Sequence, residues 1–262
     1  LRAGYGITGL NGLVLGNTPW QVTVSANSAD YPFGGGVGGG LAYVIQRLGN
    51  LDLEWETTKQ FNFGFDLGMF NNAFTFTAEF YNRQTDNLIL NVPLPPSFGF
   101  ITGNVPQNVG AMENSGFEFQ LGYNNNKNEF RWNATANLSF VTNEVTRMAE
   151  GVSNIEAGGD ADFGGFNITN TVVGQPIQAF YGWVVEGIFQ SADEVAKHAV
   201  QTAATAPGDI KFADLNGDKV IDANDRQFLG SFIPQVTYGF TLGANYKGFD
   251  ASVFFQGVGG NE

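Results

Sequence analysis

The sequence contains no cysteine and a single histidine, His198, among 262 residues. The lack of cysteine excludes disulfides, zinc–thiolate sites and thiol catalysis. A lone histidine without cysteine leaves almost no basis for a catalytic triad built on either residue. We therefore expect a protein that is not an enzyme.

Basic residues and long apolar runs are also scarce. Lys and Arg number 12 against 25 Asp and Glu, which gives a formal net charge of −13. Proteins bind phosphate backbones through basic patches, so we predict no nucleic-acid partner. No apolar run reaches the ~18 residues of a membrane-spanning helix. A closed β-barrel crosses a bilayer without such a run, so this absence does not exclude a membrane.

Alternating apolar and polar residues dominate what is present. Residues 61–83 (FNFGFDLGMFNNAFTFTAEFYNR) predict a β-hairpin with one aromatic face and one polar face, and its second strand continues to Leu90. Residues 117–123 and 132–140 predict a second hairpin, and residues 238–246 and 249–255 a third. Residues 1–8 read as a further strand.

Connections between these strands are alternately short and long. Long irregular segments are expected between residue 8 and the first hairpin, where Val22 and Val24 pair with Tyr43 and Ile45, and at 91–114 and 143–235. Long loops at one edge and short turns at the other are typical of outer-membrane barrels. We predict an all-β fold, an antiparallel up-and-down transmembrane β-barrel segment over residues 1–262, with 143–235 as a long loop region.

The aromatic residues near the short turns fit this fold. Tyr123, Trp132 and Tyr246 are expected to form one aromatic girdle at the membrane surface. A soluble β-sandwich, in which the same aromatics fill a core, remains the alternative.

An acidic segment at 214–225 (DLNGDKVIDAND) has the oxygen spacing of an EF-hand calcium loop. The predicted ligands of a structural Ca²⁺ are Asp214, Asn216, Asp218, the Val220 carbonyl, Asp222 and Asp225. Two residues depart from the pattern. Lys219 replaces the turn glycine, where a left-handed backbone costs about 1–2 kcal/mol, and Asp225 replaces the bidentate glutamate. A solvated acidic turn is the alternative.

Two weaker features lie upstream of this segment. Ser191 and Glu194 have the form of a capping box, so we expect a short surface helix that runs towards Gln201 and carries His198. Tyr181 and Trp183 are candidate substrate residues, since aromatic rings stack on sugars. Packing of these rings within a loop is the alternative.

Seven motifs together resemble one known family. The chain is similar to part of a SusC/RagA-type TonB-dependent transporter from the outer membrane of Bacteroidetes-like bacteria. The motifs are LRAGYGITG at 1–9, NLDLEWETT at 50–58, residues 61–89, NVGAMENSGFEFQL at 108–121, GQPIQAFYGWVVEGIFQSADE at 174–194, PGDIKFADLNGDKVIDANDR at 207–226, and the closing hairpin.

The resemblance implies a large barrel of about 22 strands with an N-terminal plug and a TonB-contacting segment, neither of which lies in these residues. We therefore expect the chain to be a fragment, located in the outer membrane of a Gram-negative bacterium in contact with lipid. The resemblance also implies that the long loops, with 143–235 as a long extracellular loop region, face outward and that the short turns are periplasmic. The implied function is TonB-driven import of oligosaccharides or peptides, with a SusD-type surface lipoprotein as a lid. The rivals are a secreted calcium-stabilised β-sandwich that binds carbohydrate, and a passive barrel or adhesin.

Overall fold

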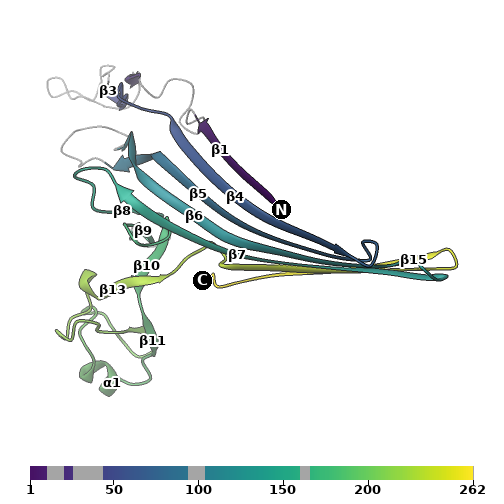
Figure 1. Cartoon of the computed structure of the whole chain (residues 1–262). Helices are drawn as coiled ribbons and strands as arrows, with labels where there is room; N and C mark the ends of the chain where they lie inside the picture. The colour runs from purple at the N-terminus through teal and green to yellow at the C-terminus, as the bar shows by residue number, and fades with distance from the viewer. Residues whose placement is uncertain (11–20, 26–43, 94–103, 160–165, 262) are drawn as a thin grey trace.

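Seven long antiparallel strands form the main sheet of the protein. The computed structural model describes residues 1–10, 21–25, 44–93, 104–159 and 166–261. The sheet has the strand order β1-β4-β5-β6-β7-β14-β15 and curves as one layer (Figure 1). Its strands are β1 (Arg2–Leu10), β4 (Glu56–Met69), β5 (Phe74–Pro93), β6 (Asn104–Asn125), β7 (Phe130–Met148), β14 (Val236–Tyr246) and β15 (Phe249–Gly259).

The tight turns of the three hairpins gather at one end of the sheet (Figure 1). The last of them, Lys247–Gly248, has φ values of 48° and 85°. Positive φ at both central residues gives a turn whose twist matches that of the strands it joins. The three predicted hairpins and the N-terminal strand are therefore confirmed.

Two of the expected loop boundaries are wrong. Residues 104–114, expected to be irregular, belong to β6, where Val105 pairs with Val92 and Asn108 with Ile89 of β5. β7 likewise continues to Met148, so the long loop region expected at 143–235 begins only after residue 148. These strand ends extend beyond the apolar part of the sheet, where neither face must be hydrophobic. The alternation that marks a strand is therefore absent from their sequence.

The segment between β7 and β14 (residues 149–235), called the excursion below, contains small sheets of its own (Figure 1). One sheet has the order β13-β10-β9-β8, and a ribbon pairs β11 with β12. The elements are β8 (Ile155–Ala157), β9 (Thr169–Thr171), β10 (Ala179–Trp183), β11 (Val185–Ile188), α1 (Ala192–Lys197), β12 (Ile210–Phe212), the 3-10 turn η4 (Ala223–Asp225) and β13 (Arg226–Gly230). Near the N-terminus, β2 (Thr23–Ser25) pairs with β3 (Val44–Arg47). Val24 lies opposite Ile45 as expected, while Tyr43 lies outside the described residues.

Helix α1 begins as predicted and ends early. The Ser191 side chain caps it by accepting the Glu194 N–H at 3.2 Å. The helix stops at Lys197 because Val200 pairs in extended form with the segment at 219–221. His198 is therefore the C-cap and not a surface helix residue, and its ring packs against Phe189 at 5.2 Å between centroids. No helix in the described part of the chain is long and apolar enough to cross a membrane.

Burial is concentrated at the long-loop end of the molecule. The buried apolar side chains there include Val105, Val109, Ala111, Val145 and Ile155. Among the described residues, every pair of elements in extensive contact is a pair of hydrogen-bonded neighbouring strands. No second layer of described residues covers the main sheet, so these residues do not form the β-sandwich of the alternative interpretation.

Candidate functional site

One face of the main sheet is apolar and exposed. Phe63, Phe80, Phe117 and Phe140 are cross-strand partners on β4, β5, β6 and β7, and they form a phenylalanine row. Phe117 is 52% exposed and Phe63 is 46% exposed, although a soluble protein would bury such side chains. The 11 residues of β14 span about 33 Å along the strand, or roughly 25 Å in height at a tilt of about 40°. This is the height of the apolar band of an outer-membrane barrel.

The predicted aromatic girdle residues meet at the short-turn end of this face. The rings of Tyr123 and Trp132 lie 4.8 Å apart between centroids, and Tyr246 lies 6.3 Å from Phe130. The Lys247 ammonium lies 5.3 Å from the Tyr246 ring centroid. Aromatic rings with a polar neighbour suit the boundary between hydrocarbon and water.

The opposite face of the sheet is polar and held by charge-assisted hydrogen bonds. Arg2 Nε lies 3.0 Å from Asp66 Oδ2, and Arg2 Nη2 lies 3.1 Å from Glu79 Oε2. Thr77 donates to Asp66 at 3.1 Å, and Asn62 donates to Glu79 at 3.3 Å. Two hollows of about 390 and 460 Å³ open on this face, and Glu79 and Glu118 line both. The polar face can therefore contact water or a hydrophilic solute.

The acidic loop at 214–225 brings its predicted ligand residues into one turn. Asp214 accepts the N–H groups of Gly217 at 2.7 Å and Lys219 at 2.9 Å. Asn216 accepts the Asp218 N–H at 2.9 Å, and Asp218 accepts the Val220 N–H at 2.8 Å. Lys219 has a φ of 69°, so the left-handed backbone expected at this position is present.

Asp222 and Asp225 close the same loop. Their side chains form a capping box around η4, and Asp225 is fully buried. Asp225 accepts the backbone N–H of Asp222 at 2.8 Å and that of Leu215 at 2.9 Å. These bonds to the ionised carboxylate hold the pKa of Asp225 below its usual value. No group of three or more His, Cys, Asp or Glu side chains is arranged as metal ligands in the part of the chain that the structure describes. Calcium binding by this loop stays a prediction.

The two candidate substrate residues lie next to this loop. Trp183 Nε1 donates to the Asp222 carbonyl at 2.7 Å, which ties β10 to the acidic loop. The Arg226 guanidinium lies 4.6 Å from the Tyr181 ring centroid and 5.4 Å from that of Trp183. Both rings thus pack on a buried arginine that the sequence did not single out. Sugar binding by Tyr181 and Trp183 stays a prediction.

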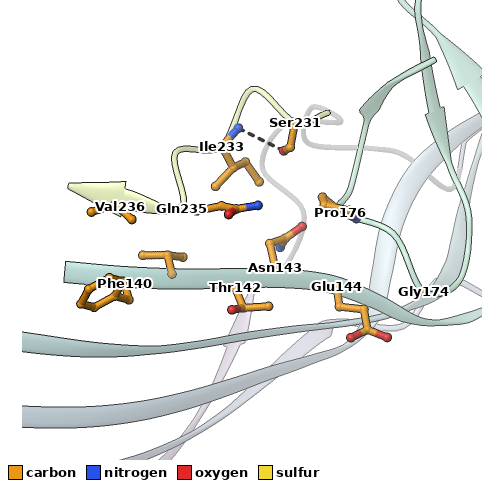
Figure 2. Close-up of a pocket in the computed structure, with 11 residues that line it drawn as sticks. Phe140, Thr142, Asn143, Glu144, Gly174, Pro176, Ser231, Ile233, Gln235 and Val236 are labelled. Atoms are coloured by element: carbon orange, nitrogen blue, oxygen red, sulfur yellow. Dashed lines mark hydrogen bonds between the residues drawn. The ribbon is translucent and has the colours of Figure 1, made fainter. Parts of the chain in front are cut away.

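A third hollow marks the junction between wall and excursion. A cavity of about 400 Å³ lies between β7 and the segment 231–236, which leads into β14 and pairs with β7 only from Val236 onwards (Figure 2). Figure 2 shows Asn143 pointing from β7 towards Pro176 and this segment, while Thr142 and Glu144 point the other way. Val141 and Val145 of β7 bond the excursion here through Gln235 and Gln175, each at 2.9 Å. Sequence reasoning missed this junction because a single buried asparagine leaves no pattern.

Comparison with known proteins gives one consistent family. Residues 20–261 match the family described as TonB dependent receptor-like, beta-barrel. The chain is 31% identical over 265 residues to TonB-dependent receptor P3 of Formosa agariphila, which covers 100% of this chain and 25% of the relative. It is 31% identical over 264 residues to TonB-dependent receptor SusC of Bacteroides thetaiotaomicron, which covers 96% of this chain and 24% of the relative.

Solved structures agree with these sequence relatives. The structure of the RagAB peptide transporter superposes with a TM-score of 0.73 at 28% identity, covering 96% of this chain and 25% of that one. The RagAB peptide importer in the "open-open" state also gives 0.73 at 28% identity, covering 99% and 26%. The chain spans about a quarter of the length of the curated relatives it matches.

Proposed function

The chain belongs to the TonB-dependent receptor β-barrel family, and on that premise we propose that it forms wall and extracellular loops of an outer-membrane importer of the SusC/RagA type. The observation that carries the proposal is the two-sided sheet. The phenylalanine row and its apolar neighbours face lipid, while the network around Arg2, Asp66 and Glu79 faces an aqueous lumen.

The cargo of this importer is an oligosaccharide or a peptide. The polar face supports a hydrophilic solute, because its hollows are lined by carboxylates, amides and hydroxyls. Tyr181 and Trp183 at the long-loop end add ring surface for stacking on a sugar. The two RagAB structures are titled as a peptide transporter and a peptide importer, which keeps peptides as the second cargo class.

The proposed position in the outer membrane also indicates the partners of the protein. A SusD-type lipoprotein covers the long loops, and TonB acts through a part of the protein outside these residues. The excursion offers apolar surface for the lid, because Ile188 and Ile210 are exposed cross-strand partners and Val200 and Val220 are exposed bridge partners. Such a patch suits a protein contact. Calcium bound at 214–225 would hold this part of the excursion in place.

The test is uptake by cells that carry the complete protein. Fluorescent oligosaccharides and peptides, each too large for porins, are supplied separately to wild-type and deletion strains. The proposal expects loss of uptake of one cargo class on deletion, and the same loss when a protonophore removes the energy that TonB uses. Uptake that survives the protonophore would instead favour a passive barrel. A chain that stays soluble without detergent would exclude both.

A further inference from the structure

One phenylalanine of the main sheet lies on the polar face. Phe254 of β15 is the cross-strand partner of Thr241, which is in turn the partner of Thr135 on β7. Its neighbour Phe255 pairs with Phe240 on the apolar face. Among the described strands of the main sheet, every other phenylalanine falls on the apolar face by register. Phe254 is 61% exposed, so its ring is available to a solute on the polar face.

A hollow of about 510 Å³ opens close to this ring, at the short-turn end of the polar face. Ser252 lines the hollow and lies two residues before Phe254, on the same face and about 7 Å away along the strand. Gly243, the cross-strand partner of Ser252, also lines it. Asn133 lies opposite Gly243 on β7, and a Cβ on Gly243 would collide with the Asn133 amide. The absence of a side chain at Gly243 therefore gives the Asn133 amide its place in the hollow.

The polar side chains that line this hollow are mostly amides, and their charges cancel. The four asparagines are Asn124, Asn126, Asn133 and Asn245, and the two charged residues are Arg131 and Asp250. Asn245 donates a side-chain hydrogen bond to Asp250 and is the cross-strand partner of Arg131. Each amide presents N–H donors and a carbonyl acceptor side by side. Such groups match neighbouring hydroxyls, since each hydroxyl both donates and accepts a hydrogen bond.

We propose that Phe254 and this hollow form a subsite in the lumen for an uncharged oligosaccharide. The C–H face of one sugar ring stacks on Phe254, and hydroxyls further along the chain bond the amides of Asn133 and Asn245. Phe254 and Asp250 lie about 14 Å apart along β15, so the ligand is a chain of sugar units and not a monosaccharide. A peptide fits less well, because its apolar side chains would find one ring and an amide-lined hollow. The inference rests on the proposed importer function and gives the sugar class a place in the lumen.

The test measures oligosaccharide binding by the complete protein in detergent. The probe is the fluorescent oligosaccharide that cells import in the uptake experiment, and fluorescence anisotropy gives its Kd. Phe254→Ala should raise the Kd about tenfold, whereas Phe254→Tyr keeps a ring and should stay within about twofold of wild type. Asn133→Ala should raise the Kd about fivefold, because it removes hydrogen bonds to hydroxyls. Phe255→Ala is the matched control, since Phe255 is also 61% exposed but lies on the apolar face, and it should leave the Kd unchanged.

Three other results overturn the inference. If Phe254 packs against another part of the protein, Phe254→Ala lowers the thermal unfolding temperature and leaves the Kd unchanged. If cells import peptides and no oligosaccharide, the subsite has no sugar to bind, and the inference fails while the importer function stands. If cells import neither class, the proposed function itself fails and the inference fails with it.

Discussion

The side-chain oxygen of Asn143 accepts the backbone N–H of Ile177 at 2.8 Å, which ties the barrel wall to the long excursion. The same side chain donates to Asn114 Oδ1 on the neighbouring strand at 2.7 Å. Asn143 is buried, so neither bond is readily replaced by water. The Asn143 side chain thus hydrogen-bonds both the neighbouring strand β6 and the excursion. It therefore fixes where the excursion leaves the sheet.

Replacing Asn143 with alanine should loosen this junction. The change leaves the Ile177 N–H and the Asn114 oxygen without their partner, at a cost of about 1–3 kcal/mol. Hydrogen exchange at the Ile177 N–H should accelerate, while exchange at the backbone N–H groups of β14 stays slow. Asn126→Ala, in an exposed short turn, is the control and should change neither rate. If the Ile177 N–H exchanges as slowly in Asn143→Ala as in the wild-type protein, the junction does not depend on the Asn143 side chain.

The acidic loop should lose stability in acid through Asp225. The folded-state pKa of Asp225 lies below its unfolded value, because backbone N–H groups of Asp222, Leu215 and Asn216 bond the carboxylate. Its contribution is therefore present above the usual pKa of aspartate and is lost as pH falls through the lower folded value. Trp183 donates to the Asp222 carbonyl, so its fluorescence should report the change.

The Asp225→Asn variant separates this carboxylate from the rest of the protein. An amide has one acceptor oxygen in place of two, so the loop should be less stable at neutral pH and its acid transition should be reduced. Asp193→Asn on exposed α1 is the matched control and should keep the wild-type transition. An unchanged acid transition in Asp225→Asn would assign the pH response to another group.

The strands of the main sheet could be predicted from the sequence alone, while the contacts that connect the excursion to the sheet and hold it together could not. Alternation around Phe63 and Phe117 marks strands because one face of the sheet is apolar and the other polar, which imposes a period of two. Residues 104–114 of β6 do not alternate between apolar and polar, because neither face is uniformly apolar there, so this part of the strand carries no such signal. Asn143 and buried Arg226 escaped notice because their partners, Ile177 and Tyr181, are distant in sequence. The left-handed Lys219 was predicted, since one loop pattern fixes it locally.

A charge placed in the apolar band should impair membrane assembly, and the cost should depend on the face. Leu121 lies on the apolar face opposite Phe76 and Ala136, so Leu121→Lys should cost about 2–4 kcal/mol. The neighbouring Gln120→Lys places the same charge on the polar face and should cost little. Urea unfolding from lipid vesicles measures both. Equal costs would mean that the two faces meet the same solvent.

Lys219 offers a stabilising change in the acidic loop. Its φ of 69° is unfavourable for a residue with a Cβ, while glycine adopts this conformation freely. Lys219→Gly should therefore stabilise the loop by up to about 1 kcal/mol, after the entropy that glycine loses on folding. Slower hydrogen exchange at Ile221, which bonds the Val200 carbonyl at 2.9 Å, would register the gain. Faster exchange at Ile221 would show that the lysine side chain stabilises the loop by more than its backbone strain destabilises it.

Removal of two loop carboxylates tests the calcium prediction. Each aspartate oxygen that accepts a loop N–H keeps a free lone pair, so Asp214 and Asp218 can bind a cation without breaking their turn bonds. The wild-type protein should hold stoichiometric calcium after exhaustive dialysis, as measured by atomic emission. Asp214→Ala with Asp218→Ala should remove it, because oxygen-ligand count and charge set calcium affinity. Asp193→Ala on α1 removes an acidic residue outside the loop and should leave calcium content unchanged. Dialysed wild-type protein without calcium, or a double variant that retains it, would show that residues 214–225 form a solvated acidic turn held by its own backbone bonds.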